Sequence, residues 1–245
     1  MQYFGGKQRI CKYIAEAIND THTHTQYVEP FCGSCNVASK VNIKNKILND
    51  KNNYLIHMFK ELQNGWIPPD LVTEEDYKLA RINQDKEPHV AGFIGFACSF
   101  AGKFWGGYAR DKKGENSGNY ALRGKNSILK KMETLMNSEF SCKDFLELNF
   151  ENSLIYCDPP YRNTTSYYKK ILGEFPYDKF IDWVKEQSKN NTVIISEYKH
   201  NVPDGATIIM EIPSKTSIRD KGGNVIETTE ILFTYNNLQK HIDSN

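Results

Sequence analysis

The chain has 245 residues, of which 39% are hydrophobic and 25% are charged, and its formal net charge is +1. These values are ordinary for a folded globular protein, so they exclude a disordered chain and a fibrous repeat. The longest apolar stretch, Phe93 to Gly102, is about half as long as a bilayer span requires, and the first residues lack the apolar core of a signal peptide. We therefore expect a cytoplasmic protein with no membrane partner.

The first third of the chain alternates between predicted helices and strands. Apolar residues at helical spacing predict a helix from Lys7 to Asn19. A short strand is predicted from Gln26 to Pro30, and a second from Lys46 to Asn49. The helix that follows is marked by Leu55, Phe59 and Leu62. This alternation predicts a parallel sheet with helices on its faces, whose ligands bind beyond the carboxyl ends of the strands.

The alternation stops near Pro69, and we interpret residues 65–137 as a mostly helical insertion. Between Ala101 and Lys131 the chain carries eight Lys or Arg and two acidic residues. A compact positive region is typical of a surface that binds phosphates, although a solvated basic loop has the same composition. The candidate phosphate contacts are Lys103, Arg110, Lys112, Lys113, Arg123 and Lys125.

Strands resume after the insertion. They are predicted at Ser153 to Cys157 and Thr192 to Ser196, with a helix from Pro176 to Lys189 between them. The segments Ala206 to Pro213 and Glu227 to Tyr235 are expected to form an antiparallel hairpin at the end of the chain. The sequence thus predicts an α/β fold with a main domain, residues 1–64 and 138–245, interrupted by the inserted one.

The most specific motif is Asp158-Pro159-Pro160-Tyr161, directly after a predicted strand. It suits chemistry on an aromatic amine, whose nitrogen is a poor nucleophile while its lone pair is delocalised into the ring. Two acceptors aimed at the two N–H groups correct this, and the Asp158 carboxylate and the Pro159 carbonyl can provide them. Tyr161 offers a flat face for stacking a base. A rigid turn is the structural alternative.

Four motifs in order give the chain a resemblance to the Dam-like, or α-group, DNA adenine-N6 methyltransferases. They are Tyr3-Phe-Gly-Gly-Lys7, Glu29-Pro-Phe-Cys-Gly-Ser-Cys35, the acidic end of the second strand at Asn49-Asp50, and Asp158 to Tyr161. The resemblance covers most of the chain. It implies a Rossmann-like S-adenosylmethionine-dependent methyltransferase fold, double-stranded DNA as partner, and residues 65–137 as the target-recognition domain.

The resemblance also implies the residues around S-adenosylmethionine. Five of them have a structural alternative: Gly33 suits a tight turn before a helix at Asn36 to Lys40, Asp50 and Asp144 suit helix N-caps, Lys7 suits the surface and Phe145 the core. The expected cofactor contacts are Tyr3, Lys7, Phe31, Gly33, Asp50, Asp144, Phe145 and Asp158, and the expected catalytic residues are Asp158, Pro159 and Tyr161.

We expect direct methyl transfer to a flipped adenine, by a monomer or a weak dimer on DNA, without a cysteine nucleophile. Cys157 is accordingly expected to be an inert strand residue. In the insertion, Phe104, Trp105, Tyr108 and Arg110 combine rings and charge. They suit phosphate contacts and a wedge into the base stack, or else the core of the insertion. Further candidate phosphate contacts in the last loop are Lys215, Arg219 and Lys221.

The sequence departs from the family pattern at Cys35, where the second loop glycine is replaced. Cys32 and Cys35 have C-x-x-C spacing, but no second ligand pair stands near them, so a cofactor loop is favoured over a redox or metal site. Three other functions stay open: cytosine-N4 methylation, methylation of RNA or of a protein amide, and DNA binding without catalysis.

Overall fold

The structure is a computed structural model, which describes residues 1–21, 23–110, 118–162, 173–219 and 225–236. At residue 21 and in 214–219 and 225–228 only the backbone is described. The candidate phosphate contacts Lys112, Lys113 and Lys221 lie outside the described residues. No helix in the described part of the chain is both long and apolar enough to cross a membrane.

Within the described residues, seven strands form a single sheet. The strands are β1 (Gln26–Glu29), β2 (Asn45–Asn49), β3 (Glu139–Ser141), β4 (Ser153–Cys157), β5 (Thr192–Tyr198), β6 (Thr207–Arg219) and β7 (Val225–Thr234). Their order across the sheet is β3-β2-β1-β4-β5-β7-β6. The first five are parallel, whereas β7 runs antiparallel to both β5 and β6. This topology confirms the expected Rossmann-like methyltransferase fold with its antiparallel C-terminal strands.

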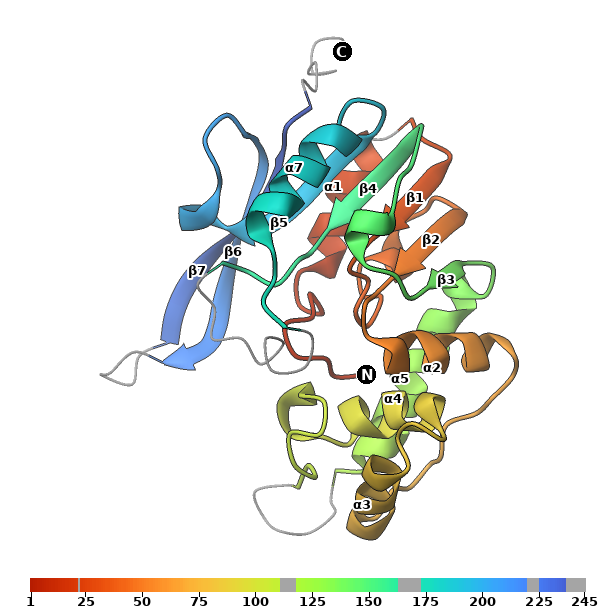
Figure 1. Cartoon of the computed structure of the whole chain (residues 1–245). Helices are drawn as coiled ribbons and strands as arrows, with labels where there is room; N and C mark the ends of the chain where they lie inside the picture. The colour runs from red at the N-terminus through yellow and green to blue at the C-terminus, as the bar shows by residue number, and fades with distance from the viewer. Residues whose placement is uncertain (22, 111–117, 163–172, 220–224, 237–245) are drawn as a thin grey trace.

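Helices cover both faces of the sheet (Figure 1). The α-helices are α1 (Cys11–Thr21), α2 (Asn53–Gln63), α3 (Glu74–Ile82), α4 (Pro88–Ala97), α5 (Tyr120–Leu135) and α7 (Tyr177–Gln187). The short 3-10 helices are η1 (Ala38–Lys40), η2 (Phe100–Gly102), η3 (Phe145–Glu147) and η4 (Lys199–Asn201).

The buried residues divide into two cores because successive strand residues point to opposite faces. Tyr27 and Leu154 belong to the core that includes residues of α1, α2, α4 and α5. Their neighbours Val28 and Ile155 belong to the other core, under α7. All five residues of β4 are buried, as expected for a strand covered on both faces.

The helices α3, α4 and α5 gather beyond the end of the sheet at which the parallel strands finish (Figure 1). α4 packs so closely on α2 that a Cβ atom at Gly92 would lie 2.1 Å from the Tyr54 carbonyl oxygen. α5 then leads back to β3 at the sheet edge. We retain 65–137 as the proposed inserted domain, and the packing of α4 on α2 shows that it shares a core with the rest of the chain.

Two local predictions from the sequence were wrong, and one strand was missed. The first helix begins at Cys11 rather than Lys7, because the residues before it form turns in which the Lys7 carbonyl accepts from the Ile10 and Cys11 amides. The segment expected to be helical from Asn36 to Lys40 forms only the 3-10 turn η1. β3 was not predicted, since a strand of three residues with one buried side chain has no recognisable period.

Candidate active site

The Asp158 carboxylate lies at the carboxyl end of β4. Its side chain is 20% exposed, whereas Pro159 next to it is buried. Asp158 Oδ1 accepts a hydrogen bond of 2.6 Å from Lys7 Nζ, across 151 positions of sequence. Burial raises the pKa of Asp158, and the ammonium of Lys7 opposes that rise. The carboxylate is therefore accessible at the strand end and fixed by a charged partner.

Lys7 is shared between two carboxylates. Its Nζ lies 2.6 Å from Asp158 Oδ1 and 3.3 Å from Glu230 Oε1, and its side chain is 9% exposed. Burial lowers the pKa of Lys7, but the two carboxylates outweigh that effect, so the pKa is raised. Lys7 is therefore a buried, charged residue of the site. The sequence reasoning missed Glu230, whose only signal was an acid next to the apolar run Ile231 to Phe233.

Tyr161 is held on several sides. Its hydroxyl donates a hydrogen bond to Glu230, and the Lys7 ammonium lies 4.4 Å from its ring centroid. The ring of Tyr198 meets it edge-on, with centroids 4.7 Å apart. One ring face is thus occupied by the cation, so base stacking on Tyr161, which remains a prediction, has to use the other face or follow a movement of Lys7.

Asp50 fixes the loop after β1. Its Oδ2 accepts from the Gly33 amide at 2.9 Å, and its Oδ1 accepts from the Asn52 amide at 2.8 Å. The N-cap of α2 is Asn52, whose side chain accepts from the Tyr54 and Leu55 amides, so the alternative role of Asp50 as a cap was wrong. Burial raises the pKa of Asp50 to about 6, against the two backbone hydrogen bonds that lower it.

Gly33 and Tyr3 lie against each other at this loop. Gly33 has φ of 47°, and a Cβ atom there would lie 2.8 Å from Tyr3 Cε1. Cys35, in the place of the family glycine, also has a left-handed backbone, with φ of 54°. The sequence correctly placed a tight turn here, but the turn requires an unfavourable conformation of a residue with a side chain.

The loop that contains Gly33 and Cys35 is hydrogen-bonded to α5. Lys131 on α5 donates a hydrogen bond of 2.6 Å to the carbonyl oxygen of Ser34. The Ser34 hydroxyl itself is buried and has no hydrogen-bond partner among the described residues. Burial lowers the pKa of Lys131 to about 8, although nearby thiols and the Glu29 carboxylate oppose the change. The sequence reasoning missed Lys131 because its spacing is that of any helix residue.

An aromatic cluster lies beside the loop on the α7 side of the sheet. Phe31 and Phe145 have ring centroids 5.5 Å apart, and Phe175 lies 5.7 Å from Phe31. Asp144 is the N-cap of η3, as its structural alternative stated, and its Oδ2 also accepts from Lys51 Nζ at 2.8 Å. A cofactor contact by Asp144 and Phe145 remains a prediction.

The residues expected around S-adenosylmethionine fit such a molecule. Gly33 lets the loop backbone lie directly against the Tyr3 ring, and the orphaned Ser34 hydroxyl provides an unused polar group in the same loop. Asp50 supplies a carboxylate at the end of the neighbouring strand. These features follow the carboxyl ends of β1 and β2, and ligands of parallel sheets bind at such ends.

Cys32 and Cys35, in the loop after β1, do not form a disulfide bond. All six cysteines fall in described residues and are free thiols. Cys32 is buried, and its pKa is raised well above the ordinary value, chiefly by burial. The pKa of Cys157 is raised in the same way. In the described part of the chain, no cluster of three or more His, Cys, Asp or Glu has the arrangement of a metal site.

The four candidate phosphate contacts that the structure describes each lie against another side chain. Arg110 pairs with Glu74, and Lys125 Nζ lies 2.8 Å from Asp70 Oδ1. Lys103 lies 4.7 Å from the Phe4 ring centroid, and Arg123 lies 4.5 Å from that of Tyr120. Phosphate contacts by these side chains remain predictions. Two of them would exchange an exposed carboxylate for a phosphate, at small cost in free energy.

The aromatic residues Phe104, Trp105 and Tyr108 of the insertion pack in or against the hydrophobic core. Phe104 is 7% exposed and stacks on Tyr54, with ring centroids 5.0 Å apart. Trp105 donates to Gln84 Oε1, and the Tyr108 hydroxyl donates to the Val72 carbonyl. Phe104 therefore lies in the hydrophobic core, and Trp105 and Tyr108 pack against it, which favours the role in the core over the wedge.

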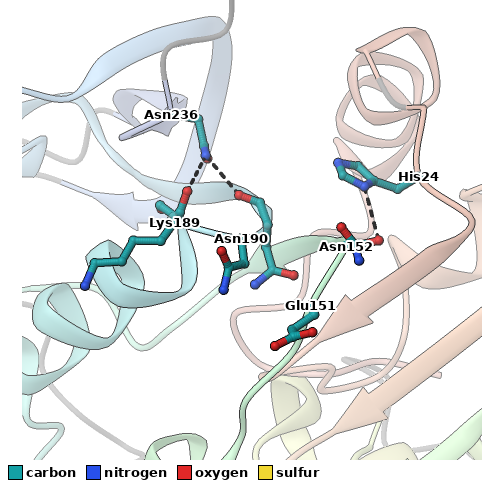
Figure 2. A pocket seen from close by; sticks show the side chains of 8 residues that line it. His24, Glu151, Asn152, Lys189, Asn190 and Asn236 are labelled. Atoms are coloured by element: carbon teal, nitrogen blue, oxygen red, sulfur yellow. Dashed lines mark hydrogen bonds between the residues drawn. The ribbon is translucent and has the colours of Figure 1, made fainter.

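A hollow of about 530 Å³ lies at the opposite end of the sheet (Figure 2). Glu151 and Asn152 line it just before β4, and Asn191 lines it just before β5. Its polar groups serve the turns: the Asn236 side chain donates to the Ser188 and Asn191 carbonyls, each at 2.9 Å. Ligands of parallel sheets bind at the carboxyl ends, so we do not assign the active site to this hollow.

The sequence is related to known methyltransferases. It is 24% identical over 192 residues to the type II methyltransferase M.FokI of Planomicrobium okeanokoites, a match that spans 69% of this chain and 29% of that protein. The solved structures that this fold resembles include rRNA methyltransferase aviRa from Streptomyces viridochromogenes. That match has 8% identity and a TM-score of 0.45, over 94% of this chain and 85% of that one. The 23S rRNA methyltransferase ErmE matches at 10% identity and a TM-score of 0.42, over 94% of this chain and 69% of that one. These structural likenesses are too distant to carry functional information.

A family model gives the more specific result. The model of the D12 class N6 adenine-specific DNA methyltransferases matches residues 3–90 and 97–223. These ranges include the Tyr3 to Lys7, Glu29 to Cys35 and Asp158 to Tyr161 motifs. Since the match extends over most of its length, the chain belongs to the D12 class of N6 adenine-specific DNA methyltransferases.

Proposed function

We propose that this chain transfers a methyl group from S-adenosylmethionine to N6 of adenine in double-stranded DNA. The observation that supports this most directly is the Asp158 carboxylate, 20% exposed at the end of β4 and 2.6 Å from Lys7 Nζ. Gly33 follows β1, which neighbours β4, and Asp50 follows β2, the next strand beyond β1. The expected donor site and the acceptor carboxylate would therefore lie at the same end of the sheet.

The chain's own residues activate the amine. When bound, S-adenosylmethionine would supply a methyl group on a positively charged sulfur: the amine nitrogen would form a bond to the methyl carbon as the carbon–sulfur bond breaks, and S-adenosylhomocysteine would leave as a neutral thioether. The Asp158 carboxylate and the Pro159 carbonyl accept hydrogen bonds from the two N–H groups of the amine, which draws its nitrogen towards tetrahedral geometry. Both acceptors are preset by the rigid Pro159-Pro160 backbone, so little reorganisation is needed during reaction. Asp158 then receives the proton that leaves the nitrogen.

The proposal includes the surroundings of the reaction. Adenine must leave the duplex to reach Asp158, because its amine is paired inside the helix. The inserted region, residues 65–137, would hold the DNA while the base is out. We propose that the protein acts in the cytoplasm, as a monomer or a weak dimer on DNA.

A single assay tests the reaction and the base. Unmethylated plasmid DNA is incubated with the protein and methyl-labelled S-adenosylmethionine, digested to nucleosides and separated. We expect the label in N6-methyladenine. Label in N4-methylcytosine would instead establish cytosine chemistry. Binding of DNA with no labelled nucleoside would contradict catalysis.

The buried carboxyl of Asp50 predicts a pH dependence of cofactor binding. Its pKa is raised to about 6, and only the ionised form accepts hydrogen bonds at both oxygens. The affinity for S-adenosylhomocysteine should therefore fall as the pH is lowered through about 6. Isothermal titration calorimetry between pH 8 and pH 5 measures this, and Asp50→Asn should bind more weakly with a flatter profile. An unchanged wild-type affinity over that range would exclude a direct contact.

The basic residues of the insertion predict a salt dependence. Lys112→Ala together with Lys113→Ala should weaken binding to all DNA sequences and lower the slope of log affinity against log salt by about 1.8, for two phosphate contacts. Fluorescence anisotropy with two unrelated duplexes measures both. Lys12→Ala with Lys44→Ala, outside the inserted region, is the charge-matched control. A slope equal to that of the wild type would reject the contacts.

A further inference from the structure

Glu230 lies in the active site but belongs to the antiparallel part of the sheet. It sits on β7 opposite Tyr198, the last residue of β5, and is 4% exposed. Its carboxylate accepts from the Tyr161 hydroxyl and lies 3.3 Å from Lys7 Nζ. Its contacts are therefore with the two side chains that surround Asp158.

The position of Lys7 weakens Asp158 as the acceptor in the proposed chemistry. The ammonium donates to Asp158 Oδ1 at 2.6 Å, so one of the two carboxylate oxygens that could accept an amine N–H is already engaged. A charged donor at this distance also withdraws electron density from the acceptor. The Lys7 side chain is 9% exposed, so its ammonium needs a carboxylate partner nearby if it moves away from Asp158.

We propose that Glu230 is a positioning residue, which takes the Lys7 ammonium from Asp158 when the target amine binds. The inference rests on the proposed function. The distances make the transfer short, since Lys7 Nζ is already within 3.3 Å of Glu230 Oε1. The ammonium remains paired throughout, and Asp158 becomes free to hold the amine. Glu230 acts on the reaction through Lys7, not by touching the reacting atoms.

The test separates the chemical step from binding. Glu230→Gln keeps the size of the side chain but removes the charge that attracts Lys7. We expect its single-turnover rate of adenine methylation to fall about 10- to 100-fold, with the affinities for S-adenosylhomocysteine and DNA within about twofold of the wild type. Glu211→Gln is the matched control, because Glu211 pairs with Lys199 at 2.8 Å on an exposed part of the neighbouring strand β6.

A double-mutant cycle then tests the route through Lys7. With Lys7→Met already present, the ammonium is gone, and adding Glu230→Gln should change the rate by less than about twofold. A full additional loss in the double variant would overturn the proposal, as would a wild-type rate in Glu230→Gln. If Glu230→Gln does not fold, Glu230→Asp replaces it: its shorter reach should lower the rate at unchanged cofactor affinity, and a wild-type rate would overturn the proposal.

The controls distinguish this proposal from the function on which it rests. A wild-type protein that labels no adenine rejects the proposed function itself. A wild-type protein that methylates adenine, together with a fully active Glu230→Gln variant, rejects only the role of Glu230. Loss of S-adenosylhomocysteine binding in Glu230→Gln, with the fold retained, would assign Glu230 to cofactor binding and would also overturn the positioning role.

Discussion

Replacing Asp158 by Asn should lower the rate of methyl transfer about 100- to 1000-fold while the protein keeps its fold. An amide of the same shape presents an N–H where the amine requires an acceptor, and loss of one preorganised electrostatic contact typically has this effect. The fold should tolerate the change because Asp158 is 20% exposed and Lys7 keeps Glu230 at 3.3 Å. Initial rates with labelled cofactor and circular dichroism measure the two parts.

The control for this variant is Asp178→Asn. The Asp178 side chain is 99% exposed and pairs with Arg162 at 3.2 Å, so it tests the loss of a carboxylate from an ion pair outside the site. It should keep the wild-type rate. The acceptor role of Asp158 would be refuted by an Asp158→Asn protein that retains more than about a tenth of the activity. Asp158→Ala should be equally inactive.

Gly33→Ala should weaken binding of S-adenosylhomocysteine at least about tenfold and lower the free energy of unfolding by about 1 to 2 kcal/mol. The backbone at Gly33 has φ of 47°, which disfavours any side chain, and the added Cβ would lie 2.8 Å from Tyr3 Cε1. Either Tyr3 or the loop has to move, and both belong to the expected cofactor site. Calorimetry and urea unfolding measure the two effects.

Gly65→Ala separates the backbone strain from the clash. Gly65 has φ of 92°, but no described heavy atom lies within 4 Å of a Cβ atom placed there. This variant should lose about 1 kcal/mol of stability and bind the cofactor product normally. Equal binding by Gly33→Ala and the wild type would show that the loop does not approach the cofactor.

Patterns with a clear period made most of the fold predictable. β4 and β5 are apolar runs of the length of a buried strand, and the Phe59 and Leu62 spacing marked α2. The segment after Cys35 was predicted to be an α-helix but forms only a 3-10 turn. Cys35 has a left-handed backbone, and the extended backbone resumes at Val41, so too few residues lie between them for an α-helix. Such a conformation depends on tertiary contacts rather than on local propensity.

The site was predictable where the chemistry lies in one continuous motif. Asp158 and Tyr161 follow a strand, and that position alone suggested their role. The pairing of Lys7 with Glu230 joins distant segments through an antiparallel strand, and no periodicity reveals such a meeting. The role of Phe104 and Trp105 stayed open in the sequence because rings interleaved with glycine suit an exposed wedge and a small core equally well, and only the burial of Phe104 favours the core.

The hydrogen bond from Lys131 to Ser34 has a thermodynamic consequence. α5 carries Arg123 and Lys125, proposed to face DNA, near its start, and Lys131 holds the carbonyl between Gly33 and Cys35. If both proposed sites are correct, a change in the position of this helix would alter the binding free energies of DNA and of the methyl donor. Linkage makes the effect reciprocal: the factor by which the methyl donor strengthens binding of DNA must equal the factor by which DNA strengthens binding of the donor.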